Sequence, residues 1–174
     1  MTLAQVLRYI EYYAAGQPAV STIVRNDIFR LNGMPSVCYG VFAWLQNQHT
    51  TDVDSDFIHY NFTFFYADRL TANRSNEIEV QSVGMQVLEN VLRWLREARI
   101  EPEGSYQYKT FNQRFADECA GVFVTVTLSV PKDDVCADHY GDSLIEPEPL
   151  VLNWSDEYNL YTYNIGDNKT IYII

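Results

Sequence analysis

The stretch Asp56–Arg99, DFIHYNFTFFYADRLTANRSNEIEVQSVGMQVLENVLRWLREAR, predicts a β-strand, a polar turn and a long helix. In Phe57–Tyr66 every second residue is apolar, and alternate side chains of a strand point to the same face of a sheet. The predicted strand therefore has one face that must be covered. The residues on that face are Ile58, Tyr60, Phe62, Phe64 and Tyr66.

A polar turn, Asp68–Ser75, separates this strand from the predicted helix. Asn76, with Glu79 three residues later, is typical of a capping box at a helix N-terminus. From Val80 to Leu95 apolar residues recur at spacings of three and four, which gives the helix one apolar stripe. We therefore expect the helix to lie back on the sheet and to cover the aromatic row.

The chain before this stretch predicts one short helix and two extended segments. Thr2–Ala14 has apolar residues at helical spacing, and Gly16 ends the helix. Ser21–Leu31 is expected to be extended. Ser36–Gln46 is expected to be a strand with apolar residues on both faces, which indicates that it is covered on both sides. The polar stretch Asn47–Asp56 should project as a hairpin arm or loop.

After the long helix, Ile100–Ser105 is expected to be a turn, and Tyr106–Phe111 and Gly121–Pro131 are expected to be strands. The order of elements, α-β-β-β-α-β-β, predicts an α+β fold in which two helices cover an antiparallel sheet. This predicted domain spans Met1–Pro131.

The residues from 132 to 174 are expected to form a β-rich C-terminal extension. Lys132–Pro149 is acidic and contains two prolines, which is typical of a linker or arm. Leu150–Trp154 and Tyr158–Ile174 predict short strands, the last two of which could form a hairpin. A two-stranded hairpin is marginally stable alone, so it should pack on the body or on a neighbouring subunit's sheet.

The composition describes a chain that can bury a core and carries a strong negative charge. It has 174 residues, of which 47% are hydrophobic and 20% charged, and its formal net charge is −11. This charge argues against a surface that binds duplex DNA, because neutralising phosphates requires Lys and Arg. It is compatible with a channel wall that DNA passes without sticking.

No targeting or membrane segment is expected from the sequence. The N-terminus does not have the pattern of a secretory signal, and no apolar run approaches the ~20 residues of a membrane span. Cys38, Cys119 and Cys136 are widely spaced, which does not suggest a disulfide framework. We expect synthesis in a cytoplasm.

The sequence contains no recognisable catalytic motif, and we expect neither an enzyme, nor a metal site, nor a cofactor. Asp52, Asp54 and Asp56 alternate like the start of a calcium loop, but the glycine and distal glutamate of such a loop are missing. Cys136 and His139 have a metal-like spacing, but structural zinc needs four ligands, usually in two close pairs.

Three segments resemble small virion proteins of tailed phages and prophages of gut Bacteroidetes, including crAss-like phages. The segments are FFYADRL from Phe64, SNEIEVQS from Ser75 followed by the long helix, and FADECAGV from Phe115 before the last strand. The order of elements over Met1–Pro131 is also similar to that of tail terminator and tail-completion proteins.

The resemblance implies a structural protein of the virion, made in the cytoplasm of a bacterial host. In such families a ring of six or twelve copies lies at the head–tail junction, or neck, continues the portal channel, contacts portal or connector and tail proteins, and lets DNA through its lumen without specific binding. The family implies no catalytic residues, and no membrane is involved. Our candidates for subunit contacts, from the arm and the extension, are His49, Asp52, Asp54, Asp56, Tyr158, Tyr161, Tyr163, Ile171 and Tyr172.

Two other functions remain open from the residues alone. The row of Tyr60, Phe62, Phe64 and Tyr66 could line a small-molecule pocket or active site between sheet and helix, although the same row is also what a packed core requires. The negative charge could belong to a DNA mimic that inhibits a host protein, but the acidic residues cluster mainly in loops and in the tail.

Overall fold

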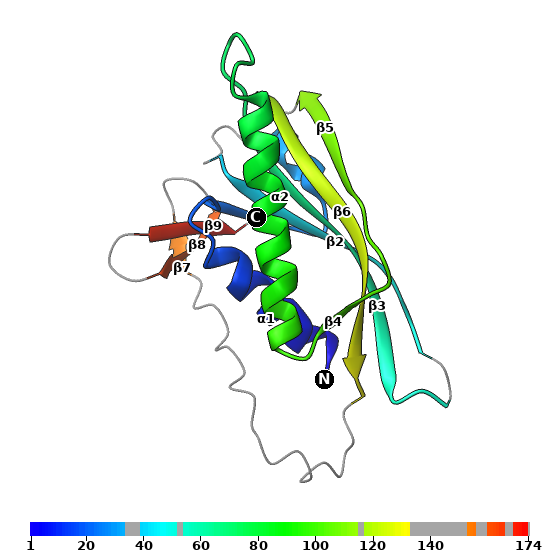
Figure 1. Cartoon of the computed structure of the whole chain (residues 1–174). Helices are drawn as coiled ribbons and strands as arrows, with labels where there is room; N and C mark the ends of the chain where they lie inside the picture. Colours follow the sequence, from blue (N-terminus) through cyan, green and yellow to red (C-terminus); the bar gives the residue numbers. More distant parts are fainter. Residues whose placement is uncertain are drawn as a thin grey trace.

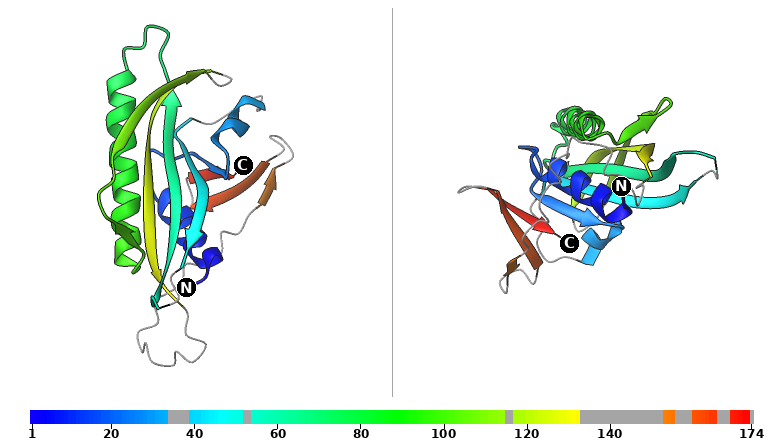
Figure 2. Two further views of the ribbon diagram at one scale, coloured as in Figure 1. Left: turned by 90° about the vertical axis from the view of Figure 1, so that its right-hand side faces the viewer. Right: turned by 90° about the horizontal axis from the view of Figure 1, so that it is seen from below.

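A computed structural model describes residues 1–33, 39–51, 54–114, 117–132, 153–155, 160–165 and 169–173. Two helices lie on one face of a single sheet, and the longer one runs along that face (Figures 1 and 2). The elements in chain order are α1 Leu3–Ala15, β1 Thr22–Arg25, the 3-10 helix η1 Ile28–Gly33, β2 Val41–Thr50, β3 Phe57–Arg69, α2 Glu77–Glu97, β4 Glu101–Glu103, β5 Tyr108–Arg114, β6 Glu118–Pro131, β7 Asn153–Ser155, β8 Leu160–Ile165 and β9 Lys169–Ile173.

The strands lie in the order β4-β6-β3-β2-β1-β9-β8-β7, and β5 also pairs with β6. The centre of the sheet is the antiparallel pair of β3 and β6, which runs from Phe57 opposite Pro131 to Arg69 opposite Cys119. Two strands share the other edge of β6: β5 covers its first half and β4 covers part of its second half. The expected α+β fold with a helix-covered sheet is confirmed.

The sheet is mixed rather than wholly antiparallel, because β1 pairs in parallel with both β2 and β9. The segment Ser21–Leu31, expected to be extended throughout, is a strand only to Arg25 and then turns into η1. This connection returns the chain to the end of the sheet from which β1 started, so β2 begins opposite Thr22 and runs in the same direction. A tight hairpin at Asn32 would have made the pair antiparallel.

The aromatic row of β3 is the centre of the core. Phe62 and Phe64 are fully buried, and Tyr60 and Tyr66 nearly so, beneath the apolar stripe of α2. The helix lies so close to the sheet at Gly84 that a Cβ there would come within 2.8 Å of the Tyr66 ring. The expectation that helix and strand form one core is therefore confirmed.

The start of α2 differs from the prediction. Asn76 stands at the N-cap position, but its side chain makes no capping hydrogen bond. Its amide donates to the carbonyl of Arg69 at 3.0 Å and accepts from the N–H of Thr71 at 2.9 Å. Asn76 therefore closes the turn between β3 and the helix, which competes with the expected capping box.

The other differences concern where strands begin and end. β2 starts later than expected and continues to Thr50, so much of the predicted arm is strand. The predicted turn Ile100–Ser105 contains β4, which pairs with β6 from Glu101 opposite Ser129. The connection between the last two predicted strands is shorter than expected, because β5 continues to Arg114 and β6 begins at Glu118.

An ion pair with a buried carboxylate and a partly exposed guanidinium fixes α1 on the sheet. Thr2 and Gln5 form a capping box at the start of this helix, and Glu11 lies on its buried side. The Glu11 carboxylate accepts bonds from Arg25 Nε and Nη2 on β1, at 2.7 and 2.6 Å, and from Trp44 Nε1 on β2 at 3.3 Å. One side chain thus connects the first helix to two strands.

The predicted C-terminal hairpin is present as β8 and β9, which pair from Tyr161 opposite Ile173 to Ile165 opposite Lys169. It packs on the protein's own body, because β9 pairs with β1 and the side chains of Ile171 and Ile173 are buried in the main core. Figure 1 shows β7, β8 and β9 on one side of α1. The predicted linker, beyond Lys132, lies outside the described residues.

Candidate subunit-contact surface

The face of the sheet opposite α1 and α2, which we call the outer face, carries a connected set of uncharged polar groups. Asn47 donates to Asn61 Oδ1 at 2.7 Å and to Thr63 Oγ1 at 2.9 Å. Asn61 donates to Thr127 Oγ1 at 3.2 Å, and the hydroxyls of Thr63 and Thr125 are 3.1 Å apart. This polar ladder crosses β2, β3 and β6 and is satisfied by its own hydrogen bonds, so it carries no charge to oppose a protein partner.

Next to the polar ladder lies an aromatic cluster on the same face. Phe65 on β3 is 5.7 Å from Phe123 on β6 and 6.4 Å from Phe111 on β5, measured between ring centroids. All three rings are half-buried, and the nearby outer-face residue Leu45 is 36% exposed. Apolar groups gathered on one side of an open sheet are typical of a protein contact.

A small second core lies on the outer face, between the sheet and η1. Ile28 and Leu31 of η1 pack with residues of β1, β2, β3 and β6, and Phe65 and Phe111 border this cluster. η1 therefore covers one end of the outer face, and the polar ladder is not among the described residues that pack beneath it. The buried members of this core are Val24, Ile28, Leu31, Val41, Ala43, Ala67 and Cys119.

The hairpin arm is formed by the end of β2 and the start of β3. A register shift between Gln46 and Gln48 marks a β-bulge, which reverses the alternation of the side chains beyond it. His49 consequently lies opposite Tyr60, with ring centroids 6.2 Å apart, on the side of the helices. Asp54 is exposed near the tip of the arm.

The end of β6 is joined to the tip of the arm, in the turn between β2 and β3. The N–H of Lys132 donates to the carbonyl of Asp56 at 2.8 Å, and its ammonium donates to the carbonyl of Ser55. The N-terminal amine of Met1 donates to the carbonyl of Pro131 at 2.7 Å. The side chain of Asp56 remains exposed, so the acidic groups at the tip of the arm are presented next to a backbone that is bonded to Lys132.

The structure separates the remaining predicted contact residues. Asp52 and Tyr158 lie outside the described residues. Tyr161 and Tyr163 belong to β8, whose backbone alone is described, and Tyr172 is half-buried on β9. Ile171 is fully buried in the chain's own core, so it is a core residue rather than a surface for a neighbour.

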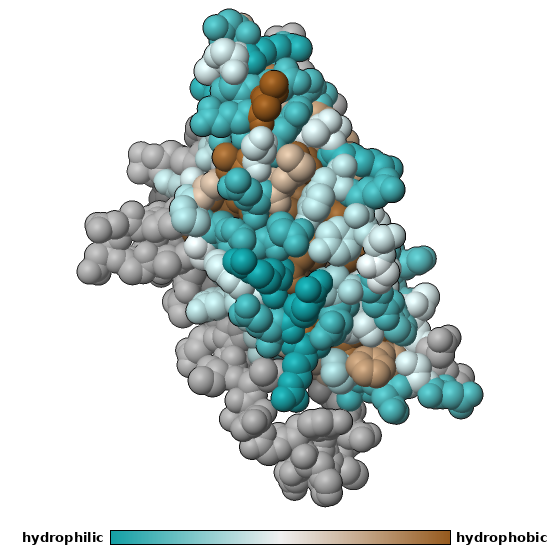
Figure 3. Space-filling model, viewed as in Figure 1, coloured by the Kyte–Doolittle hydropathy of each residue, from teal (hydrophilic) through white to brown (hydrophobic). Residues whose placement is uncertain are grey.

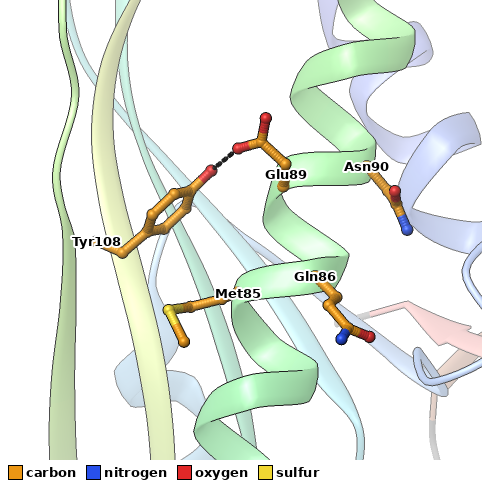
Figure 4. A pocket seen from close by; sticks show the side chains of 5 residues that line it. All are labelled: Met85, Gln86, Glu89, Asn90 and Tyr108. Atoms are coloured by element: carbon orange, nitrogen blue, oxygen red, sulfur yellow. Dashed lines mark hydrogen bonds between the residues drawn. The ribbon is translucent and has the colours of Figure 1, made fainter.

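The helix side of the molecule is less suited to a broad contact. Figure 3 shows that the described part of this side is mainly hydrophilic, with separate hydrophobic groups over α2. Between α2 and β5 lies an open groove of about 460 Å³, lined by Met85, Gln86, Glu89, Asn90 and Tyr108 (Figure 4). Tyr108 donates a 2.5 Å hydrogen bond to Glu89, which ties β5 to the helix. Burial, followed by this bond to the carboxylate, raises the pKa of Tyr108.

The aromatic row, one candidate lining for a ligand pocket, fills the space between the sheet and α2 with packed side chains. Tyr60, Phe62, Phe64 and Tyr66 are each at most 5% exposed and contact one another or the stripe of α2. The row is therefore structural. The Tyr66 hydroxyl donates to the carbonyl of Ala19 at 3.3 Å, which accounts for the one polar group at this end of the row.

A polar cluster lies at the end of the outer face where β6 begins. Asp117 accepts a bond from the Tyr39 hydroxyl at 3.1 Å and lies 3.2 Å from the guanidinium of Arg69. Beside it Cys119 is buried, and burial raises the pKa of this thiol to about 11. The thiol stays protonated near neutral pH, which makes it a poor nucleophile.

Within the described residues, no three His, Cys, Asp or Glu side chains converge as ligands for a metal ion. Cys136 and His139 lie outside that part of the chain. In the described ranges, no helix combines the length and the apolar character that crossing a membrane requires.

Sequence reasoning did not single out the polar ladder or the aromatic cluster. Thr125 and Thr127 alternate with buried valines, so a solvated strand face was visible in the sequence. Only the pairing of β3 with β6 and of β5 with β6 shows that Phe65, Phe111 and Phe123 lie together. The sequence matches no protein-family model, and no curated protein shows significant similarity to it.

Proposed function

We propose that this protein is a structural virion protein that forms a ring at the head–tail junction of a tailed phage. The ring would join the portal or connector to the tail and continue the DNA channel, and the protein itself would act without catalysis or a cofactor. The proposal starts from the sequence resemblance to virion proteins and from the element order similar to that of tail terminators.

The observation that carries the proposal furthest is the outer face. Both helices lie on one side of the sheet, and no helix of the described residues other than η1 lies over the uncharged polar ladder and half-buried aromatic cluster on the other side. Broad contacts between proteins have this composition, with aromatic groups at the centre and few charges. A ring made of one kind of subunit needs such a surface on every copy.

The charge supports the proposed passage of DNA. With a net charge of −11, the protein as a whole repels phosphates, and exposed acidic groups such as Asp54 and Asp56 lie at the tip of the arm. A channel lined by acidic groups lets a duplex slide without stopping, because no set of Lys and Arg neutralises the phosphates.

Electron microscopy of the purified protein, alone and mixed with the portal protein encoded in the same genome, tests the proposal. We expect rings of six or twelve copies with a central hole wide enough for a DNA duplex. Isolated small particles in both samples would contradict the proposal, and the search would then move to a binding or enzymatic role.

A further inference from the structure

The sheet of this protein ends in two long strand edges that have no partner in the described part of the chain. β2 pairs with β1 only from Val41 to Trp44, so Leu45–Thr50 pair with β3 alone. At the opposite side of the sheet, Tyr108–Arg114 pair with β6 alone. An edge of free N–H and C=O groups is a template for another strand, and proteins that must stay monomeric usually block it.

We propose that subunits join head to tail by pairing the free edge of β2 in one copy with the free edge of β5 in the next. This inference rests on the proposed ring and specifies its subunit interface. The free edge of β2 has six residues and the free edge of β5 has seven, so the two edges are similar in length. The edge residues Gln46–Thr50 include no Lys and no Pro, two of the usual protections against pairing, and the bulge near Gln46 leaves Gln48–Thr50 in regular register with β3.

The strand directions fit this arrangement. Each neighbouring pair in the series β2, β3, β6 and β5 is antiparallel, so β5 runs antiparallel to β2. If the outer faces of two copies lie on the same side, β5 of the next copy therefore approaches β2 in the antiparallel direction. The four strands then repeat as one continuous antiparallel sheet, and the polar ladder and aromatic cluster line a single surface.

Charge favours β5 over the other free edges. The arm from Asn47 to Asp56 contains three aspartates and no Lys or Arg, whereas the sequence of β5, YKTFNQR, contains two basic residues and no acidic one. β4 carries Glu101 and Glu103, which would repel the arm, and Pro102 between them cannot donate a backbone hydrogen bond. β7, at the far edge of the sheet, has only three residues.

Two side-chain hydrogen bonds fix the position of β5 relative to α2. Tyr108 is bonded to Glu89, and Asn112 donates to Glu77 at 2.8 Å, so two side chains anchor the strand to α2. The alternate residues Lys109 and Phe111 lie on the outer face, opposite Phe123 and Gly121 of β6. The backbone of β5 is thereby fixed in position at the border of the sheet (Figure 1), where β6 is its only strand partner among the described residues.

The pairing requires a stagger between neighbouring copies. Positions along β6 measure this stagger. The middle of β5, Phe111, lies level with Gly121 of β6. The middle of the free part of β2, Gln48, lies level with Thr127 of β6, because both align with Asn61 of β3. Six residues of strand correspond to a displacement of about 20 Å. A closed ring accommodates such a stagger when its strands are tilted relative to the axis, as in a barrel.

Disulfide crosslinking of the assembled protein tests this contact. Variants combine Lys109→Cys on β5 with Gln48→Cys or Thr50→Cys on β2, all on the outer face, and Thr110→Cys with Gln46→Cys, both on the helix side. The two cysteines of each pair thus share a face of the sheet, and more than one register is covered. In one chain, β3 and β6 keep these positions about 14 Å apart or more, whereas a disulfide needs Cα atoms within about 7 Å. Any bond between the two cysteines therefore joins two copies.

The matched control pairs Gln48→Cys with Glu103→Cys on β4, and the wild type is oxidised in parallel to account for the native cysteines. We expect a ladder of covalent oligomers for at least one β2–β5 variant and none for the control pair. Circular dichroism checks that each variant is folded before it is oxidised.

Combining the crosslinks with microscopy separates this inference from the proposed function. Rings without a β2–β5 crosslink at any register would overturn the interface and leave the neck assignment standing. A β2–β5 ladder in particles that never form rings would support the contact and contradict the neck assignment. Crosslinking of the β4 control pair at the same yield would also overturn the choice of β5.

Discussion

Replacing Arg25 with Met should destabilise the protein, although more than a third of the Arg25 side chain is exposed. The substitution keeps most of the aliphatic part of the side chain and removes the cation that binds Glu11 through Nε and Nη2. The Glu11 carboxylate, which is 6% exposed, then loses both bonds from its cationic partner and keeps the 3.3 Å bond from Trp44. Removing one partner of a buried ion pair costs far more folding free energy than removing one partner of a surface pair.

The size of the effect follows from the burial of the two partners. Breaking a fully buried pair costs about 3–5 kcal/mol, but solvent reaches 37% of the Arg25 side chain, so we expect a loss of about 2 kcal/mol. For a chain of this length that loss lowers the melting temperature by about 4–8 °C. The pair of Arg74 and Glu118, 3.4 Å apart with both side chains about half exposed, provides the matched control.

Urea denaturation of Arg25→Met, Arg74→Met and the double variant Glu11→Gln/Arg25→Met measures these free energies. Arg74→Met should cost less than about 0.5 kcal/mol, because surface pairs contribute little. The double variant should recover most of the loss, since no unpaired charge stays buried and Gln can still accept a bond from Trp44. A double variant as unstable as Arg25→Met, or an Arg25→Met variant as stable as the Arg74 control, would refute the reasoning.

Three further changes test other parts of the structure. Gly121→Ala places a Cβ 2.2 Å from the carbonyl oxygen of Tyr66 and 2.6 Å from the ring of Phe111, so the free energy of unfolding in urea should fall by about 1–3 kcal/mol. Burial raises the pKa of Asp68, so the folded state binds its proton more tightly than the unfolded state does. The stability of Asp68→Asn relative to wild type should therefore increase as pH rises above about 4. A stability difference between the two proteins that stays constant from about pH 4 to 7 would contradict this. Cys119, whose thiol pKa is raised to about 11, should react with iodoacetamide at pH 8 only after unfolding, and mass spectrometry of labelled peptides would reveal any earlier reaction.

Periodicity was sufficient to predict the centre of this fold. The aromatic row of β3 and the stripe of α2 are each continuous in the sequence, and burying one against the other leaves a single arrangement. The capping box of Thr2 is formed as local sequence predicts for this residue type, although Asn76 uses its side chain in the preceding turn instead. Local signals succeed where no tertiary partner competes for the same side chain.

The contacts between distant strands could not be predicted in this way. The bulge near Gln46 reverses the alternation of the arm, and a period-2 pattern carries no sign of one inserted residue. The chain after β1 forms the 3-10 helix η1 instead of continuing as a strand, and β1 pairs with β2 in parallel. The proposed contact surface depends on which strands pair, since Phe65 and Phe111 are adjacent only because both flank β6.

The parallel pairing of β1 with β9 imposes an order of events on synthesis. β1 leaves the ribosome early, yet Thr22 and Ile23 find Tyr172 and Ile173 only after about 150 more residues, which takes about 8–30 s at ordinary rates of translation. Such a distant pairing is also intrinsically slow, because a long loop must close before the contact forms. During that interval the part from α1 to β6 can fold while the edge of β1 that will pair with β9 is still free. Nascent chains on neighbouring ribosomes of one messenger RNA would then be the chains most exposed to wrong pairing through this edge. Deleting β9 should therefore lower the soluble yield more steeply at high expression rates than at low ones.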